Sequence, residues 1–462
     1  MLQRSAKTLT FVLLLSILAN YTLFAYVASC DFPVSDQWVW LRNVVLPYAD
    51  NQIDFWGFIT YEFETLSHSH ILTLLAIYIN YHLLDLNFSM NGAIGHAALL
   101  FSAYNLYRQL FAKYPEMDNS SIRFLPIIAI SCAFFSISNR TTFASNLLSF
   151  EQLYLALASI GALLILNSAD NIKGYALTFF VAFFMITLGD AMGVVAAVSL
   201  VGVYSLSALI ERKNFVKLLV VIAPFVMLVT LNVLFDIDSR EHASHNISLL
   251  QFATENPASV VQSITNLSSR VFFNLAQFRL HLAENQLPIQ LSACLSLLII
   301  AYAYTIYVSR KLYRQSYIPL FLLIFTGVAF IGVFSSRVPV FGAEYMHGGR
   351  YYRLFAMAGI GALYVFYLNL IEDTTVVNKS ITALVCVAVI GFHVAASFHA
   401  WGAIGSTQKY QANITYQAIA YSNDETNDFA EQFSRCSKEY CESSIAFLKD
   451  KKMSFFRTVN ND

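Results

Sequence analysis

The chain has 462 residues, of which 57% are hydrophobic, 15% aromatic and only 12% charged, and its formal net charge is −1. Soluble globular domains carry about 25% charged residues, so this composition excludes an ordinary soluble protein and predicts an all-α polytopic membrane protein surrounded by membrane lipids. Without an excess of basic residues, no nucleic-acid partner is expected.

The first predicted element is an apolar stretch, residues 8–28, which follows the basic residues Arg4 and Lys7. It is long enough to cross a hydrocarbon core of about 30 Å, and it is longer than the apolar core of a signal peptide. We therefore predict a retained first helix with a cytoplasmic N-terminus.

The next segment, residues 29–68, combines acidic and aromatic residues around one basic residue, Arg42. Carboxylates among aromatic rings suit a sugar site, since the rings can stack on a pyranose and a carboxylate can take a proton from a hydroxyl. The alternative is a solvated acidic loop in which Trp and Tyr anchor the chain at the membrane surface. The residues concerned are Asp31, Asp36, Asp50, Asp54, Glu62, Glu64, Trp38, Trp40, Trp56, Tyr48 and Tyr61.

Residues 69–87 look like a short span, but the uninterrupted apolar part runs only from Ile71 to Ile79, and the polar residues Asn80 and His82 follow. Transfer of such side chains into the hydrocarbon core costs free energy. If this segment were a span, every later basic loop would lie on the outer side of the membrane, contrary to the preference of basic loops for the cytoplasm. We predict a juxtamembrane helix on the outer face instead.

His68 and His70 lie at the start of this segment and are two residues apart, which places them roughly 200° apart around a helix. A zinc pair on a helix needs a spacing of three or four, so no metal or other cofactor is predicted, with a divalent metal left open. A histidine at the mouth of an outer cavity suits a phosphate or a sugar hydroxyl better.

Further apolar runs bring the predicted number of spans to about 11. Short basic connections alternate with long mixed or acidic ones, and short basic loops stay in the cytoplasm, so the predicted topology is N-in and C-out. Residues 1–400 then form the transmembrane domain, with outer loops at 29–90 and 236–288, and residues 401–462 form a small outer tail. The runs are 91–111, 122–138, 150–168, 174–189, 191–210, 216–235, 289–308, 317–335, 354–371 and 380–400.

An arginine-rich segment, FSSRVPVFGAEYMHGGRYYRLF, covers residues 334–355 and leads into the tenth predicted span. Arginine has forked donors that match phosphate, which favours a lipid-linked phosphate or pyrophosphate as the ligand. Pairing with lipid headgroups or with the acidic first loop is the alternative. The polar residues of the segment include Arg337, Glu344, His347, Arg350, Tyr351 and Arg353.

Two smaller polar groups lie at other predicted outer ends. SISNRTTFASNLLSFE (136–151) contains Arg140 and Glu151, and TLGDAMG (187–193) contains Asp190. A carboxylate between two spans either faces a cavity or is a plain turn residue, and the sequence leaves both open.

Cys436 and Cys441 lie five residues apart in the polar tail. This spacing predicts a small disulfide loop if the tail is outside the cytoplasm, and half of a metal site is the alternative.

The layout resembles the GT-C superfamily, polytopic glycosyltransferases that use polyprenyl-phosphate sugars. Three short motifs, SDQW (35–38), ETLSHSHILTLLAIYINYHLLDLNF (64–88) and GGRYYRLF (348–355), are similar to bacterial members of it. The resemblance covers most of the chain as architecture but only these motifs as sequence. The chain departs from better-known members because Asp36 stands without the second acid of a double-acid motif, and because SHSH lacks a charged neighbour beside the histidine.

The resemblance implies that Asp36 is the base that deprotonates the acceptor hydroxyl. His68, His70, Arg140 and Arg350 would bind the donor phosphate and stabilise its charge as it leaves, with inversion at the sugar. Further substrate-binding residues are expected in the outer segments, namely Asp54, Glu62, Asp190, Glu344, His347 and Tyr351.

The sequence therefore predicts a glycosyltransferase of the bacterial inner membrane, with its active face in the periplasm. It would move a sugar from a polyprenyl-phosphate donor to a surface glycan acceptor such as lipopolysaccharide or O-antigen. Two alternatives stay open, an O-antigen-type polymerase and a lipid-linked glycan flippase or transporter. A polymerase would depend on arginines in both 236–288 and 336–353 but not on Asp36, whereas a transporter would need a polar path through the membrane.

Overall fold

The computed structural model describes residues 2–33, 36–65, 71–112, 122, 124–138, 140–234, 249–274, 287–347, 351–372, 375–423 and 438–458. Within these ranges the chain is helical throughout, with no strand. Seven helical stretches there are long and apolar enough to cross a membrane. The protein is therefore a multi-pass α-helical membrane protein, as its composition predicts.

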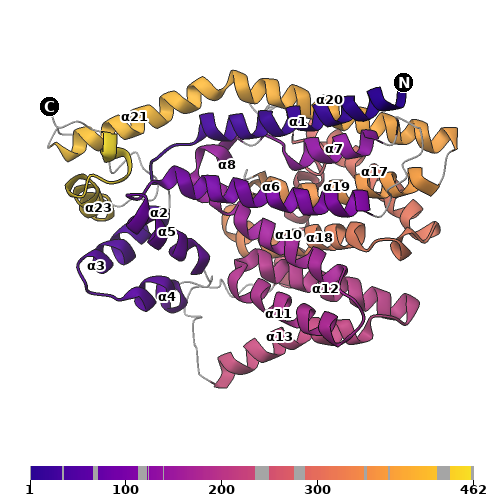
Figure 1. Ribbon diagram of the computed structural model, residues 1–462, viewed down its shortest axis with the longest axis horizontal. Coiled ribbons are helices and arrows are strands. Elements are labelled where there is room, and N and C mark those ends of the chain that lie inside the picture. The colour runs from indigo at the N-terminus through magenta and orange to yellow at the C-terminus, as the bar shows by residue number, and fades with distance from the viewer. Residues whose placement is uncertain are drawn as a thin grey trace.

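Most helices lie roughly side by side in a bundle, with the N-terminus at one end and the C-terminus beyond the other (Figure 1). The helices of the bundle are α1 (Leu2–Ala28), α6 (Phe88–Ala112), α7 (Phe124–Phe134), α8 (Arg140–Ala144), α9 (Asn146–Phe150), α10 (Gln152–Leu166), α11 (Ile172–Leu188), α12 (Asp190–Glu211), α13 (Phe215–Leu234), α14 (Leu249–Glu255), α15 (Pro257–Ser268), α17 (Leu287–Ser309), η4 (Leu312–Arg314), α18 (Ile318–Phe341), η5 (Ala343–His347), α19 (Tyr352–Glu372) and α20 (Val376–Gly402).

A smaller group of helices, which we name the cap, lies at the left end of the bundle in Figure 1. The long helix α21 (Ile404–Ser422) leads from α20 towards it. The cap consists of α2 (Asp36–Trp40), the π-helix η1 (Leu41–Val45), α3 (Leu46–Ala49), α4 (Phe55–Thr65), α5 (Ile71–Leu83), α23 (Lys438–Asp450) and η7 (Ser454–Thr458).

Helix α19 is the centre of the bundle. Every residue from Tyr352 to Leu370 is buried, and the helix packs against α18, α7 and α17. A helix that is apolar on all sides has no solvent face, so its sequence suits a position surrounded by other helices.

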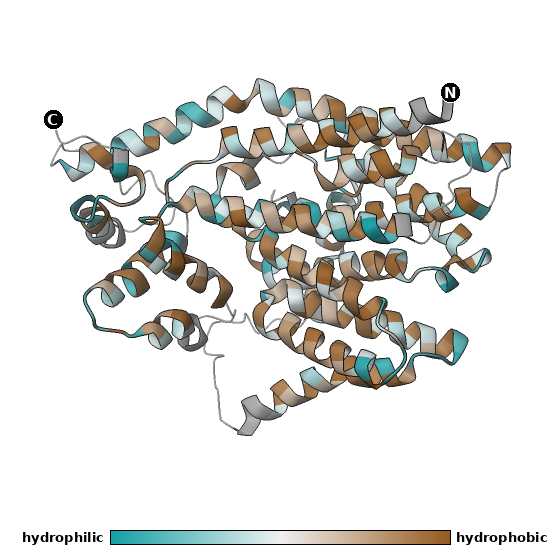
Figure 2. Cartoon of the chain, in the orientation of Figure 1, coloured by the Kyte–Doolittle hydropathy of each residue, from teal (hydrophilic) through white to brown (hydrophobic). Residues whose placement is uncertain are grey.

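The outward faces of the bundle are also apolar, and its helices are mostly brown in Figure 2. Phe180, Leu209, Leu298 and Phe398 each expose more than half of their side chain. Apolar residues in such positions are expected where lipid, and not water, surrounds the helices.

The predicted spans coincide with helices, but some helices are short. Helix α7 has 11 residues and α11 has 17, fewer than the ~20 that a perpendicular span needs. Helix α11 has a clear start, because the side chain of Asn171 accepts a hydrogen bond from the Gly174 N–H at 2.9 Å and thereby caps the helix.

The cap has its own hydrophobic core, separate from that of the bundle. Trp38 and Val44 from the first loop are buried in it together with Ile445 and Phe455 from the C-terminal segment. Residues of the predicted small outer tail therefore complete the hydrophobic core of the first loop.

Helix α5 belongs to this second core through Leu74 and Ile77. It has 13 residues, which corresponds to a length of about 20 Å, too short to cross a bilayer unaided. Helix α7, with 11 residues, is shorter still, so length alone does not separate α5 from the spans, and the juxtamembrane position of residues 69–87 stays a prediction.

Candidate functional site

A cavity of about 410 Å³ lies where the cap meets the bundle, a size in the range of small-ligand sites. Its polar walls include Glu151, Gln152, Asp190, Arg337 and Arg353. One side is apolar, with Met192, Val195, Ala329 and Val333 from α12 and α18. The cavity thus combines two carboxylates, two guanidinium groups and an apolar wall made by membrane-spanning helices.

Glu151 and Gln152 reach the cavity at the junction between α9 and α10. Helix α9 packs directly on α6 at Gly95, where a Cβ atom would lie 1.9 Å from the carbonyl oxygen of Ser149. Only a glycine permits this approach. The contact fixes the position of the chain just before the two polar residues.

Asp190 lies at the tight turn between α11 and α12 and faces the cavity. Its φ of 48° is in the left-handed region, which Asp tolerates better than most residues. The two helices touch at Gly193, where a Cβ atom would lie 1.7 Å from the Met185 carbonyl oxygen. Of the two interpretations that the sequence leaves open, the structure is compatible with both, because Asp190 is a turn residue and also lines the cavity.

Arg337 lies on the last turns of α18 and is half-buried. Pro339 follows it inside the helix and removes a backbone hydrogen bond from that turn. Among the described residues, no carboxylate forms an ion pair with Arg337. Its charge is therefore available to a ligand in the cavity.

Arg353 enters the cavity from the first turn of α19 and exposes only 7% of its surface. It donates a hydrogen bond of 2.7 Å to the Oε1 atom of Gln152, and no described carboxylate pairs with it. A buried cation without a counter-charge is unfavourable unless something else solvates it. An anionic ligand in the cavity would supply that charge.

The cap contributes Trp40 and Thr73 to the cavity wall. The hydroxyls of Thr73 on α5 and Tyr154 on α10 are 2.6 Å apart and hydrogen-bonded. The cavity therefore depends on how the cap is seated on the bundle.

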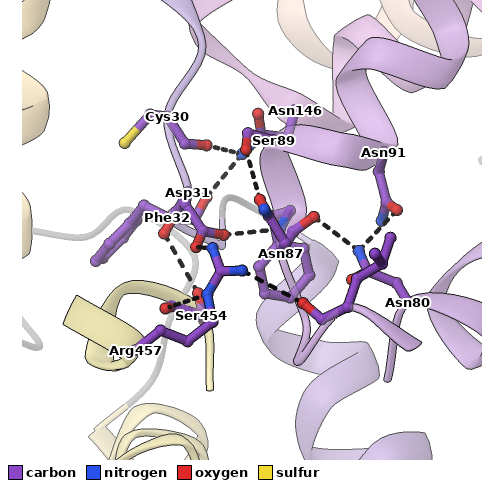
Figure 3. A network of polar contacts seen from close by, with 12 residues as sticks. Cys30, Asp31, Phe32, Asn80, Asn87, Ser89, Asn91, Asn146, Ser454 and Arg457 are labelled. Atoms are coloured by element: carbon purple, nitrogen blue, oxygen red, sulfur yellow. Dashed lines mark hydrogen bonds and ion pairs between the residues drawn. The ribbon is translucent and has the colours of Figure 1, made fainter. Parts of the chain in front are cut away.

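A polar network at the base of the cap holds this arrangement (Figure 3). Asp31 accepts a hydrogen bond from the Phe88 N–H at 2.7 Å and forms an ion pair with Arg457. Asn146, the first residue of α9, donates to the carbonyl oxygens of Cys30 and Phe32. The network links the end of α1, the start of α6, α9 and the C-terminal segment.

Burial raises the pKa of the Asp31 carboxyl, and the Arg457 charge partly opposes this effect. Burial, together with the adjacent Asp31 carboxylate, raises the pKa of the Cys30 thiol to about 11. Both shifts follow from taking ionisable groups out of water at the foot of the cap.

The cavity lies at the ends of the helices that are opposite to the basic connections. Helix α12 starts at Asp190 beside the cavity and ends before Arg212 and Lys213. Helix α18 follows the basic residues Arg310 and Arg314 and reaches the cavity near its far end. The cavity and these basic connections therefore lie at opposite ends of α12 and α18.

The structure brings together two of the predicted site residues, Asp190 and Tyr351, both of which line the cavity. Asp54 does not line it; the carboxylate accepts a hydrogen bond from the Gly57 N–H at 2.8 Å at the start of α4. Glu344 is exposed on η5, also away from the lining residues. Asp54 therefore caps a helix of the cap, and Glu344 lies on the surface; neither contributes to the cavity wall.

Other predicted residues lie outside the described part of the chain. His68, His70, Arg350 and Cys436 belong to segments that are not described, and for Asp36, Glu62, Arg140 and His347 only the backbone is described. Asp36 starts α2, the helix that ends at the cavity residue Trp40. Cys441 is disulfide-bonded, while its predicted pairing with Cys436 stays a prediction.

Sequence reasoning singled out the segments that contain Glu151, Arg337 and Arg353 but did not choose these residues for the site. It missed Gln152, at the edge of an apolar run, and Thr73, inside one. Their partners, Arg353 and Tyr154, are distant in the sequence, so no local pattern reveals them.

Within the described ranges, no three His, Cys, Asp or Glu side chains gather in a way that would hold a metal ion. Comparison of the chain with protein-family models, with curated proteins and with solved structures found no match.

Proposed function

We propose that the protein is a glycosyltransferase of a bacterial inner membrane that moves a sugar from a polyprenyl-phosphate donor to a cell-surface glycan or lipid. The observation that supports this proposal is the set of residues that line one cavity. Arg337 and Arg353 line it and have no ion-pair partner among the described residues. Glu151, Asp190 and an apolar wall complete it. A lipid-linked phosphosugar has matching parts, namely an anionic group, hydroxyls and an apolar chain.

The proposed topology has 11 spans, N-in and C-out. The basic connections at the far end of the bundle would face the cytoplasm, and the cavity would then open on the periplasmic side. The apolar wall belongs to α12 and α18, which are two of the apolar, membrane-length helices. A prenyl chain could therefore lie in the bilayer while its phosphate reaches the arginines.

In the proposed reaction, an arginine pair holds the donor phosphate and stabilises its charge as it leaves the sugar. A carboxylate accepts the proton of the attacking acceptor hydroxyl. The candidates for this base are Glu151 and Asp190 in the cavity wall and Asp36, which precedes Trp40 on the same short helix. Displacement from the opposite face would invert the anomeric carbon.

The central position of α19 favours a transferase over a transporter. A helix that is buried from Tyr352 to Leu370 fills the middle of the bundle, where a transporter would need a polar path that opens to both sides. An O-antigen-type polymerase uses similar lipid-linked substrates, and its product, a lengthened chain of repeat units, distinguishes it from transfer of a single sugar.

The test is to replace the gene in the source bacterium with variants and to compare surface glycans and lipid-linked sugars. Glu151→Gln, Asp190→Asn and Asp36→Asn should identify the base by a loss of transfer on the order of 100-fold or more. Glu255→Gln is the matched control, since Glu255 is an exposed carboxylate on α14 that accepts from Gln251.

Loss of the glycan with accumulation of donor on the periplasmic side supports a transferase. Accumulation on the cytoplasmic side indicates a flippase instead. Normal glycan in all three carboxylate variants at normal expression would remove the basis of the proposal. Glu344→Gln and Asp54→Asn in the same assay test the two predicted site residues that lie away from the cavity.

A further inference from the structure

Arg353 is held by neutral hydrogen-bond acceptors. Its Nη1 atom donates to Gln152 Oε1 at 2.7 Å, and both Nη atoms lie 3.4 Å from the Tyr21 hydroxyl oxygen. Tyr21 and Gln152 come from α1 and α10, so two different helices fix the guanidinium at the cavity. Neither acceptor carries a charge.

The orientation of the Gln152 amide is also fixed. Its Nε2 atom donates to the Leu148 carbonyl oxygen at 3.1 Å, which leaves Oε1 directed to Arg353. The amide therefore links Leu148 of α9 to Arg353. Rotation of the amide by 180° would turn its NH₂ group towards the cation and break both hydrogen bonds.

The Tyr21 hydroxyl joins Arg353 to a third side chain. Its oxygen accepts from Arg353, and it forms a hydrogen bond of 2.6 Å with Nδ1 of His96. None of Gln152, Tyr21 and His96 carries a negative charge, so these hydrogen bonds leave the charge of Arg353 uncancelled.

Aromatic rings complete the surroundings of Arg353. The guanidinium carbon lies 5.4 Å from the centre of the Tyr21 ring and 5.6 Å from that of Phe143, and the Phe143 ring stacks on His96 at 5.2 Å. Cation–π contacts stabilise a desolvated cation while leaving its net charge intact. Proteins ordinarily place a carboxylate beside a buried arginine, and here the described residues place none in ion-pair contact.

We infer that Gln152 is a positioning residue that aims Arg353 into the cavity and, because it is neutral, keeps that cation free to bind the phosphate of the ligand. The inference rests on the proposed function for the identity of the phosphate, but the anion site itself can be tested without it. A carboxylate at position 152 would differ by one atom from the amide and would neutralise Arg353.

The experiment uses the full chain in detergent, with inorganic pyrophosphate as the probe and calorimetry as the measurement. Gln152→Glu loses the hydrogen bond to the Leu148 carbonyl oxygen but gains an ion pair with Arg353, so it should fold with an unfolding temperature near that of the wild type. It should weaken pyrophosphate binding at least about tenfold, because the new ion pair competes with the ligand. A purely structural role for Gln152 would not combine retained stability with lost anion affinity.

Gln152→Met removes the acceptor without adding a charge and should weaken binding less than Gln152→Glu does. Gln109→Glu is the matched control; Gln109 accepts from Asn167 at the opposite end of the bundle and its variant should bind pyrophosphate as the wild type does. If Gln152→Glu does not fold, the test uses Gln152→Met and Tyr21→Phe instead. Each of these variants should weaken pyrophosphate binding a few-fold.

Three results would overturn the inference: no saturable pyrophosphate binding by the wild type, unchanged affinity in Gln152→Glu, or equal losses in Gln152→Glu and Gln152→Met. Loss of pyrophosphate binding in Gln152→Glu together with normal glycan transfer in the carboxylate variants would keep the anion site and reject the glycosyltransferase proposal. The two proposals can therefore fail separately.

Discussion

Arg457 forms an ion pair with Asp31 across a separation of 426 residues. The pair joins the C-terminal segment to the chain just after the first helix, and Arg457 also donates to the Leu84 carbonyl oxygen at 3.4 Å (Figure 3). Because Asp31 also accepts from the Phe88 N–H, one carboxylate connects the cap, α6 and the C-terminal segment.

Arg457→Ala should loosen the base of the cap and leave the bundle intact. We expect a local loss of about 1–2 kcal/mol, since a partly buried, charge-assisted hydrogen bond is removed and Asp31 keeps its other partner. Hydrogen exchange should rise at the Phe88 amide and in η7 but not in α19. Arg314→Ala, which breaks the pair with Glu211 at 3.2 Å at the other end of the bundle, is the control; equal exchange at the Phe88 amide and in η7 in both variants would contradict the prediction.

Thr73 and Tyr154 should be energetically coupled, because their hydroxyls form the hydrogen bond of 2.6 Å between cap and bundle. In a double-mutant cycle with Thr73→Val and Tyr154→Phe, we expect a coupling of about 0.5–1.5 kcal/mol in the unfolding free energy. Thr60→Val, which removes only a bond to the Trp56 carbonyl in the same helix, should show no coupling to Tyr154→Phe. A coupling of zero for the first pair would mean that this contact does not seat the cap.

Gly193→Ala should be strongly destabilising, since the new methyl group would meet the Met185 carbonyl oxygen at 1.7 Å and force α11 and α12 apart. We expect a loss of about 1–3 kcal/mol or more, seen as a lower unfolding temperature in detergent. Gly327→Ala on α18 has nothing within 4 Å of the added Cβ and should be neutral or slightly stabilising. Similar unfolding temperatures for the two variants would show that α11 and α12 can move apart without a loss of stability.

The Cys30 thiol should react slowly with alkylating reagents. Its pKa is raised to about 11 by burial and by the Asp31 carboxylate, and the reactive form is the thiolate. Alkylation at pH 8 should be roughly ten- to a hundredfold slower than for a free thiol, and the rate should keep rising up to about pH 10 or beyond. Peptide mass spectrometry of the folded protein measures this rate.

Asp31→Asn removes the neighbouring negative charge, so it should lower the Cys30 pKa and shift the rate profile to lower pH. A profile that levels off near pH 9 in the wild type, or one that Asp31→Asn leaves in place, would be inconsistent with this cause of the shift.

Local hydropathy patterns were sufficient to predict that the protein is a membrane protein and where its helices lie in the sequence. Apolar runs such as 191–210 and 354–371 coincide with α12 and α19, because a helix in lipid must satisfy its backbone within itself and needs about 20 apolar residues to do so.

Some of the predicted substrate-binding residues and segments contribute to the cavity, and others do not. Asp190 and Tyr351 were expected to contact substrate and do line the cavity, and the arginine-rich segment does supply two cavity arginines. The sequence does not distinguish Asp54, which accepts a hydrogen bond at the start of α4, from a carboxylate that lines the cavity. The difference lies in the spatial neighbours of the side chain, which the sequence does not give.

The sequence by itself determined that this chain is a helical membrane protein, because hydropathy acts over short stretches of chain. Only the tertiary structure decided that α19 is central, that residues near the C-terminus complete the cap, and that Gln152, Tyr21 and Arg353 meet at one cavity. Those relationships join residues up to hundreds of positions apart, and they depend on packing distances that no local pattern encodes.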